Sequence, residues 1–423
     1  MIIRHRECAR TDSAVSDTPT HELDAHAALA ALIARLAPIT HHESAAIASA
    51  MGRVLANDVV APLDVPAFAN SAMDGYAIRS ADCVGPVSLR LVGSALAGHG
   101  HESALQAGTA VRIMTGAPLP PSADAIVPQE DARCKDNVVS FSTAVPAGQY
   151  VRPRGEHVRA GEVVIRAGTT LRAPELGLAT VVGIDEVSVY RQLRVGLAST
   201  GDELVDPPTP LTRAGSYDGN RPLLAAACRS AGFDATDLGI CGDRADEFAR
   251  LIDRARDQRL DALLVSGGSA LGDADVVRKA QSVQFLAVNI RPGRGITFGT
   301  FGDAAAPLAL IGLPGNAVST FVMFHLVGLP ALRHLAGGRA RIPEHFPMPL
   351  AVDLACRRGS IDYRRGRIEH TAAGEIRVRP LERQGAGMLR TLAEADVLIA
   401  AGPEPLYRAG ERVLVVPLAT LPR

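Results

Sequence analysis

Short apolar runs alternate with amphipathic stretches through the middle of the chain. Three such runs, each bounded by glycine-containing turns, lie at Leu193–Leu197, Ala262–Val265 and Leu308–Ile311. Runs of this length are typical of strands buried on both faces of a parallel sheet. Helical patterns lie between them, at Pro222–Ala231 and Ala245–Arg256. Strands that alternate with helices predict a doubly wound α/β domain, which we place at residues 192–338.

Before this region, apolar residues recur at the spacing of a helix. Leu29, Leu32, Ile33 and Leu36 fall on one helical face, and Pro38 ends the pattern. We expect a second, shorter helix over Ser44–Met51 and a third from Ala173 into Val182. These segments predict a discontinuous helical and linker domain made of residues 21–66 and 150–191. Residues 1–20 are polar and patternless, and we expect a mobile tail there.

Two further regions have β-like patterns. Residues 67–149 contain short β pieces at Val87–Val92, Ala110–Met114 and Ala125–Pro128, which predict a β-rich insert. A linker is expected at Pro343, Pro347 and Pro349. Residues 343–423 then show alternation, for example at Ile376–Val378 and Val413–Val416, which predicts a small carboxy-terminal β domain. The expected fold class is therefore α/β plus β, in several domains.

Composition narrows the class of protein. At about 150 residues per domain, 423 residues are enough for roughly three domains. Forty-four basic and 45 acidic side chains give a net charge of −1, which disfavours nucleic acid as a partner. Six widely spaced cysteines without a C-x-x-C pair favour a reduced, cytoplasmic protein. The longest apolar stretch, Phe321–Leu332, is interrupted by His325 and Gly328, so no membrane segment is expected.

Candidate chemistry lies in three strand-to-helix turns, because ligands of open α/β sheets bind beyond the carboxyl ends of the strands. The turns are Ser199–Leu204, Ser266–Asp275 and Gly312–Ser319. Glycine lets the main chain approach an oxyanion closely, and helix amino termini add unpaired donors. A phosphate group is the expected ligand.

Carboxylates in the same turns would repel a bare phosphate, which indicates a divalent cation, Mg²⁺, held by Glu203, Asp243 and Asp275. The alternative for any one such turn is a simple helix cap. Arg291 and Arg294 could bind phosphate or another oxyanion through paired donors, or form a solvated basic turn.

Six strings together resemble the molybdopterin molybdenumtransferase family (MoeA), whose animal relative is the carboxy-terminal part of gephyrin. They are Pro62–Pro66, Asn70–Ala77, Arg112–Ala117, Ser199–Leu204, Tyr217–Asn220 and Gly312–Asn316. The resemblance runs in order from about residue 21 to the end. It implies insertion of molybdate into adenylylated molybdopterin, with release of AMP and help from Mg²⁺, during molybdenum cofactor biosynthesis. It also implies an α/β domain like the molybdopterin-binding adenylyltransferases, and a homodimer with active sites between subunits.

The resemblance also implies roles for individual residues. The implied catalytic residues are Thr115, Glu203, Asp243 and Asp275. The implied substrate-binding residues are Ser71, Asp74, Gly201, Asp218, Asn220, Gly267, Gly268, Arg291, Arg294, Pro314, Gly315 and Asn316.

The chain departs from the family pattern at several of these sites. Ala69 and His157 stand where the family usually has Asp. Lysines of the family are replaced by Ala287, Arg291 and Arg294, and a proline of the family is replaced by Ala317. Ala69 cannot coordinate an ion or transfer a proton. Two alternatives therefore stay open beside the active enzyme: a catalytically weakened paralogue that binds or carries molybdopterin, and a scaffold dimer that binds another protein.

Overall fold

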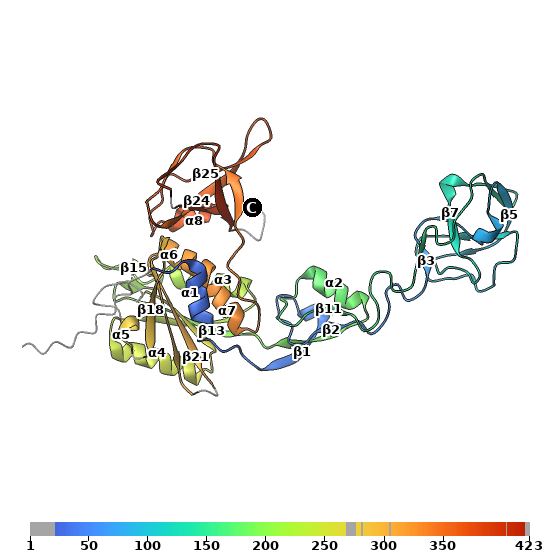
Figure 1. Ribbon diagram of the computed structural model, residues 1–423. Helices are drawn as coiled ribbons and strands as arrows, with labels where there is room; N and C mark the ends of the chain where they lie inside the picture. Colours follow the sequence, from blue (N-terminus) through green and yellow to red (C-terminus); the bar gives the residue numbers. More distant parts are fainter. Residues whose placement is uncertain (1–21, 268–275, 281, 304–305, 403, 419–423) are drawn as a thin grey trace, which may run out of the picture. The chain divides into compact units, whose positions relative to one another are not determined.

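The computed structural model describes residues 22–267, 276–280, 282–303, 306–402 and 404–418. The chain divides into two compact units (Figure 1). Unit 1 comprises Met1–Thr40 and Gln192–Arg423, and unit 2 comprises His41–Arg191.

Unit 1 is built on a six-stranded sheet in the order β16-β13-β17-β21-β20-β18. Its strands are β13 (Arg194–Thr200), β16 (Asp234–Cys241), β17 (Ala262–Ser266), β18 (Val283–Ala287), β20 (Gly295–Phe301) and β21 (Leu308–Leu313). The first three predicted strands are confirmed as β13, β17 and β21, which run parallel. Strands β18 and β20, which the sequence analysis did not predict, join the edge of this sheet antiparallel. The chain between β18 and β20 is too short for the crossover that a parallel pair requires.

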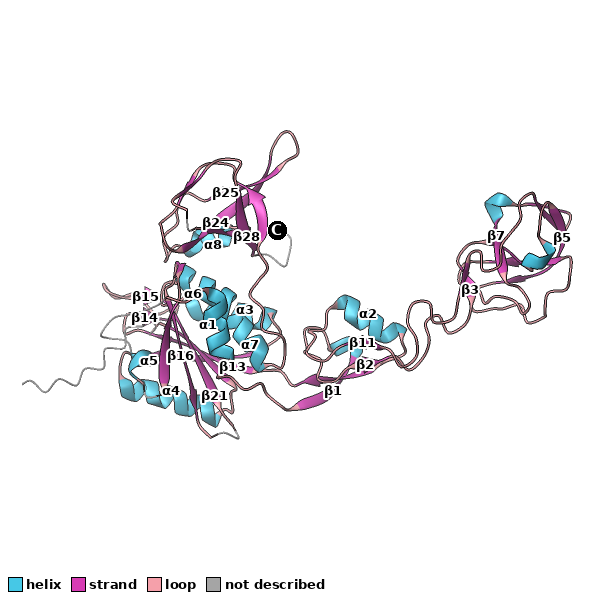
Figure 2. Ribbon diagram, viewed as in Figure 1, coloured by secondary structure: helices cyan, strands magenta, loops and turns pink. Residues whose placement is uncertain are grey.

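Helices cover both sides of this sheet (Figure 2). Helices α4 (Ala245–Asp257) and α5 (Val276–Lys279) lie on one side, and α1 (Ala25–Ile33), α3 (Asn220–Ser230), α6 (Ala317–Met323) and α7 (Leu329–Leu335) lie on the other. The two predicted helices at 222–231 and 245–256 are confirmed as α3 and α4. Helix α1 contacts α7, so this first predicted helix packs within unit 1.

Helices α6 and α7 are joined by η4 (Phe324–Gly328), a π-helical turn. The whole stretch Ala317–Leu335 is long and apolar enough to cross a membrane by length and composition alone, but 72% of its most apolar window is buried inside the protein. Its burial against the sheet and α1 is that of a core helix.

The carboxy-terminal part of unit 1 is a second sheet, in the order β19-β24-β26-β28-β22, with β25 paired to β24. Its strands are β19 (Ile290–Arg291), β22 (Phe346–Pro349), β24 (Ile361–His370), β25 (Ile376–Pro380), β26 (Val397–Ala401) and β28 (Arg412–Pro417). A short pair, β23 (Leu354–Ala355) with β27 (Leu406–Tyr407), and helix α8 (Leu389–Glu394) complete it. Pro347 and Pro349 lie in β22 and not in a linker, because an edge strand tolerates missing N–H groups.

The two sheets of unit 1 share one segment of chain. Strand β19 lies between β18 and β20 in the chain, and these two strands belong to the central sheet. Strand β19 itself pairs in parallel with β24 of the carboxy-terminal sheet. The N–H of Val318, in α6, donates to the carbonyl of Ala386 at 2.9 Å. These bonds bring the strand-to-helix turns of the α/β part next to the carboxy-terminal sheet.

Unit 2 contains a six-stranded sheet in the order β7-β4-β6-β5-β9-β8. Its strands are β4 (Gly75–Ile78), β5 (Val87–Ala95), β6 (Thr109–Ile113), β7 (Ala125–Pro128), β8 (Arg133–Lys135) and β9 (Val138–Phe141). The β pieces predicted at 87–92, 110–114 and 125–128 are confirmed as β5, β6 and β7. Two apolar clusters, one around Tyr76, Ile78 and Leu89 and one around Ala77, Val111 and Ile113, use alternate residues of the same strands.

The rest of unit 2 combines three small ladders with one helix. The ladders pair β1 (His42–Ala46) with β12 (Glu186–Tyr190), β2 (Val59–Val60) with β11 (Val163–Ile165), and β3 (Asn70–Ser71) with β10 (Val151–Arg152). Helix α2 (Ala173–Val181) confirms the predicted third helix. The predicted helix Ser44–Met51 is wrong: its first residues belong to β1, and only Ile47–Ser49 form a single 3-10 turn. Ala50 is its one buried residue, so the Ala-rich stretch has no apolar stripe to hold a helix against a core.

Candidate functional site

A cavity of about 470 Å³ opens in unit 1 where the two sheets meet. Its walls come from the β19–β20 turn, the turn before α6, strand β24 and the segment after β25. Five arginines line it: Arg291, Arg294, Arg357, Arg364 and Arg365. We call it the arginine cavity. Among the described lining residues, Asp362 supplies the one carboxylate, so the cavity has an excess of positive charge.

Arg365 is the most deeply buried of these arginines, with 0% of its surface exposed. Its Nε donates to Thr391 Oγ1 at 3.2 Å, and its Nη2 donates to the carbonyl of Gly385 at 3.0 Å. Burial, together with the neighbouring Arg364 guanidinium, lowers the pKa of Arg365 to about 10. A cation in such surroundings is stabilised by a bound anion.

Three guanidinium nitrogens on arginines that line the cavity are buried and have no hydrogen-bond partner among the described residues. They are Nε of Arg291, Nε of Arg364 and Nη1 of Arg365. A buried donor without an acceptor carries a free-energy cost of about 1–3 kcal/mol or more when it is charged. An oxyanion supplies several acceptors and a compensating charge, so the arginine cavity fits an oxyanion.

The predicted substrate turns meet at the carboxyl ends of β13, β17 and β21. Asn220 Nδ2 donates to Ser266 Oγ at 2.6 Å and to the carbonyl of Gly315 at 2.7 Å. Asp218 Oδ1 accepts the N–H of Asn220 at 2.9 Å. The N–H of Gly267 donates to the carbonyl of Leu313 at 3.1 Å. The structure therefore brings Asp218, Asn220, Gly267 and Gly315 together, and Pro314, Gly315 and Asn316 also line the arginine cavity.

Gly201 and Gly267 both have the backbone geometry that glycine permits, with φ of +147° and +94°. A Cβ on Gly267 would lie 2.5 Å from Thr200 Oγ1 and 2.7 Å from the Thr200 carbonyl. A Cβ on Gly201 would lie 2.6 Å from the Glu203 carboxylate. The predicted glycines thus keep the turns close to each other and to their acidic neighbours.

Two of the three predicted metal ligands, Glu203 and Asp243, lie among the residues that the structure describes. Asp243 and Glu203 are exposed near the ends of β16 and β13, and the N–H of Asp243 donates to Asp202 Oδ1 at 3.0 Å. Asp275 and Gly268 lie outside the described residues. In the part of the chain that the structure describes, no group of three His, Cys, Asp or Glu side chains could hold a metal ion. Glu203 and Asp243 supply carboxylate oxygens, the ligand type of Mg²⁺, which takes one or two carboxylates and completes its shell with water and substrate phosphates.

The remaining predicted residues belong to unit 2. Asp74 Oδ1 accepts hydrogen bonds from the N–H and the Oγ1 of Thr115, both at 2.7 Å. These bonds lower the pKa of Asp74. Ser71 is fully buried beside them, and the N–H of Gly116 donates to its carbonyl at 2.8 Å. Thr115 therefore forms one cluster with Ser71 and Asp74, although it lies 41 residues after Asp74 in the chain.

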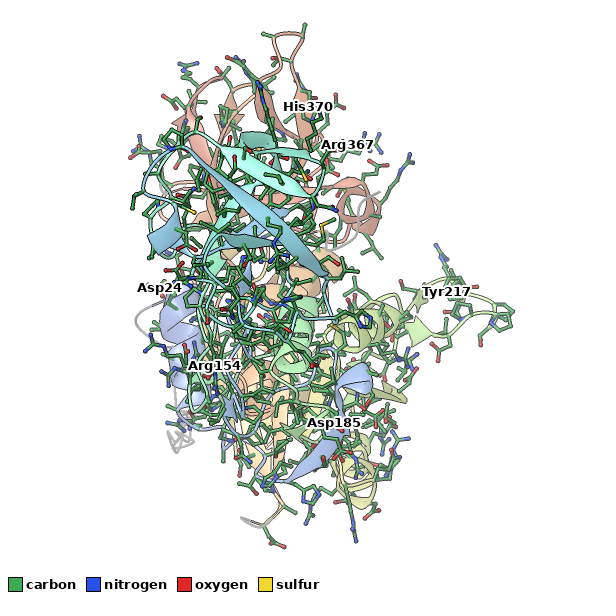
Figure 3. The ribbon with its side chains drawn as sticks, turned by 90° about the vertical axis from the view of Figure 1, so that its right-hand side faces the viewer. Asp24, Arg154, Asp185, Tyr217, Arg367 and His370 are labelled. Atoms are coloured by element: carbon green, nitrogen blue, oxygen red, sulfur yellow. The ribbon has the colours of Figure 1, made fainter. Side chains whose placement is uncertain are left out.

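One arm of unit 1 stands out from the α/β part. It begins at β14 (Leu204–Val205) and ends at β15 (Ser216–Tyr217), where Tyr217 is labelled on the projecting segment in Figure 3. Tyr217 belongs to a string that resembles the family, yet its side chain is 44% exposed and lies outside the arginine cavity.

The sequence analysis missed the four charged residues that the carboxy-terminal part contributes to the cavity: Arg357, Asp362, Arg364 and Arg365. Adjacent arginines in a β segment are a weak signal in a chain this rich in arginine. No local pattern marks Arg365, because its neighbours on the same face of β24 are Tyr363 and the exposed, charged Arg367.

Comparison with known proteins places the chain in one family. Three family models match it in order: the MoeA N-terminal region (domain I and II) at residues 23–183, the probable molybdopterin binding domain at residues 196–334, and the MoeA C-terminal region (domain IV) at residues 347–418.

Individual relatives agree. The molybdopterin molybdenumtransferase of Haemophilus influenzae is 34% identical over 385 residues, which cover 89% of this chain and 94% of the relative. The molybdopterin molybdenumtransferase 2 of Mycobacterium tuberculosis is 36% identical over 368 residues, 84% of this chain and 89% of the relative. The crystal structure of the molybdopterin biosynthesis MoeA protein of Pyrococcus horikoshii superimposes with a TM-score of 0.78 at 25% identity, over 94% of this chain and 100% of that chain. The chain belongs to the molybdopterin molybdenumtransferase (MoeA) family.

Proposed function

We propose that the protein inserts molybdate into adenylylated molybdopterin and releases AMP, and that the arginine cavity binds the oxyanion. The observation that carries this proposal is the set of buried, unpartnered donors on Arg291, Arg364 and Arg365. The neighbouring turns around Gly267, Gly315 and Asn316 lie at the carboxyl edge of the sheet, where phosphate groups of a pterin substrate would bind.

Mg²⁺ would be held by Glu203 and Asp243, with Asp275 as a third predicted ligand. When bound, the ion would neutralise charge on the phosphates and on the departing AMP. The arginine donors of the chain would hold the oxyanion, and the glycine turns would let the backbone reach the phosphates.

We also propose that the protein is a cytoplasmic homodimer and that Thr115 and Asp74 of one subunit complete the site of the other. The family resemblance at Asn70–Ala77 and Arg112–Ala117 supports this arrangement. The mutual hydrogen bonds of Asp74 and Thr115 support a shared role for the two residues. The described cysteines are free thiols, as suits a reduced compartment.

The test is AMP release from adenylylated molybdopterin, Mg²⁺ and molybdate. We expect molybdate-dependent release, and we expect Arg365→Gln to lower it at least about 100-fold, the loss typical of removing a preorganised charge-stabilising donor. Arg379→Gln is the matched control, because Arg379 lies on β25 and pairs with Glu369 at the surface. Tight pterin binding without AMP release would instead support the weakened carrier, the alternative that Ala69 and His157 favour.

A further inference from the structure

The carboxylate of Asp362 lies inside a cavity that otherwise presents cations. Asp362 is 4% exposed and follows Ile361 at the start of β24. The β19–β24 ladder sets it directly opposite Arg291. A buried acid in an oxyanion site opposes the binding of a negative charge, so its presence requires a specific role or a specific partner.

One of the two carboxylate oxygens of Asp362 already accepts a hydrogen bond within the protein. Asp362 Oδ2 accepts a hydrogen bond from Arg364 Nη2 at 2.9 Å. Among the described residues, its other oxygen, Oδ1, has no hydrogen-bond partner, although Asp362 lines the cavity. The nearby charged or titratable groups are Arg364 on the same strand, Arg291 across the ladder, the other cavity arginines, the Cys356 thiol and the Tyr363 hydroxyl. On the β26 side, its register partner is the apolar Ala401.

An ionised carboxylate accepts hydrogen bonds and donates none. A fully deprotonated tetrahedral oxyanion offers acceptors alone, so at Oδ1 it would meet repulsion. An oxyanion with a hydroxyl group donates to Oδ1 while its other oxygens accept from the arginines. Such a site discriminates against an oxyanion without a hydroxyl group, because that ligand would desolvate Oδ1 and offer it no donor.

We propose that Asp362 makes the arginine cavity selective for oxyanions that carry a hydroxyl group, accepted at Oδ1, over fully deprotonated oxyanions. The proposal rests on the proposed function, which makes this cavity the oxyanion site, and deepens it by naming the protonation class of the ligand. For a molybdate-handling protein, it means that the bound form is hydrogen molybdate and that abundant sulfate is excluded.

A simpler role for Asp362 is to hold Arg364 in place. The two roles differ in their effect on different anions. If Asp362 only positions Arg364, its replacement changes the affinity for every oxyanion by the same factor. If Oδ1 accepts a ligand proton, its replacement changes the ratio between anions with and without a hydroxyl group.

Calorimetric titration of the full-length protein with inorganic phosphate and with sulfate at pH 7 and constant ionic strength separates these roles. Phosphate keeps at least one hydroxyl group at this pH, and sulfate keeps none. We expect phosphate to bind at least about tenfold more tightly, the value of one charge-assisted hydrogen bond. Asp362→Asn should reduce the ratio to within about twofold, mainly because the new amide donates to sulfate. Glu369→Gln, on the same strand but at the surface, should leave the ratio unchanged.

Equal affinities of the wild-type protein for the two anions would overturn the proposal, as would an equal change for both in Asp362→Asn. Both outcomes leave the cavity an oxyanion site and the proposed function intact. Absence of binding by any oxyanion, molybdate included, would overturn the site assignment and this proposal together.

A second readout does not depend on the variant. Micromolar molybdate should bind the wild-type protein about tenfold more tightly per unit fall in pH between 8 and 6, because one proton is taken up with the anion. Sulfate affinity should stay constant over the same range. Parallel changes for both anions would assign the proton to the protein and contradict the proposal.

Discussion

At the scale of single residues, the local order of the substrate turns depends on Arg221. Its side chain is 5% exposed. Its Nε donates to Asp218 Oδ2 and its Nη1 to Asp237 Oδ1, both at 2.6 Å, and its Nη2 bonds Asp206. Arg221, at the start of α3, therefore links the arm between β14 and β15 to the edge strand β16.

Replacing this guanidinium leaves the buried Asp218 carboxylate without its counter-ion. We expect Arg221→Gln to lower the free energy of unfolding by about 3–5 kcal/mol, as for other broken buried ion pairs. Arg229→Gln, later in the same helix and exposed, should change it by less than about 0.5 kcal/mol. Urea denaturation followed by circular dichroism measures both, and equal losses would contradict this role of Arg221.

A second residue-scale prediction concerns Asp74. Hydrogen bonds from Thr115 hold its pKa below the usual 3.8, so Thr115→Val should raise that pKa toward the usual value. Because the folded pKa is the lower one, the stabilisation is complete above the unfolded pKa and is lost as the pH falls through the folded pKa. Carboxyl carbon NMR titration measures the shift. Thr143→Val, at an exposed site of the same unit, should leave the pKa of Asp74 unchanged. An unaltered pKa in Thr115→Val would refute the assignment.

Residue patterns predicted part of the site. Glycine turns and Arg291 could be found from the sequence because the turns follow buried strands, and strand ends of a parallel sheet share one edge. Arg364 and Arg365 could not, because their surroundings depend on tertiary contacts: Arg365, for example, bonds the carbonyls of Arg383 and Gly385 and the hydroxyl of Thr391 in α8. Local periodicity carries no information about such contacts.

At the scale of elements, strands and helices with strong periodicity were predicted well. Strands β13, β17 and β21 and helices α3 and α4 match the predicted ranges closely, because burial on both faces or along one stripe is visible in the sequence. Residues 44–51 were misassigned because β1 is held by its ladder with β12, more than 140 residues away. The antiparallel β18–β20 pair also depends on a partner and not on its own pattern.

The element-scale prediction compares two glycines of neighbouring turns. Gly267→Ala places a Cβ against the Thr200 main chain at positive φ, and we expect a loss of at least about 2 kcal/mol in unfolding free energy. Gly315→Ala meets nothing closer than Gly267 Cα at 3.7 Å, so its stability should stay within about 0.5 kcal/mol. Thermal unfolding of the two variants measures the difference. Equal stabilities would mean that the contact between the β13 and β17 turns is not as close as described.

At the scale of the whole molecule, the predicted site residues are divided between the two units. The arginine cavity and the Asp243 turn belong to unit 1, and the Asp74–Thr115 pair belongs to unit 2. The proposed homodimer makes one subunit's unit 2 serve the other subunit's cavity. The sequence supports this by resemblance alone, since no local pattern encodes an arrangement of two chains.

Complementation tests that arrangement. Thr115→Val and Arg365→Gln should each inactivate the homodimer, whereas a purified heterodimer of the two variants should regain about half of the wild-type AMP release, because one of its two sites receives both native residues. A doubly substituted subunit paired with a wild-type subunit provides the control. It should leave both sites defective. A heterodimer as inactive as either parent would place both residues in the same subunit's site.

The central claim is that the arginine cavity of unit 1 receives the molybdenum oxyanion. Anomalous X-ray scattering at the molybdenum edge from a crystal soaked in molybdate tests it most directly. We predict a molybdenum peak within hydrogen-bonding range of the free donors of Arg291, Arg364 and Arg365. A well-occupied molybdenum position elsewhere, with the cavity empty, would contradict the account.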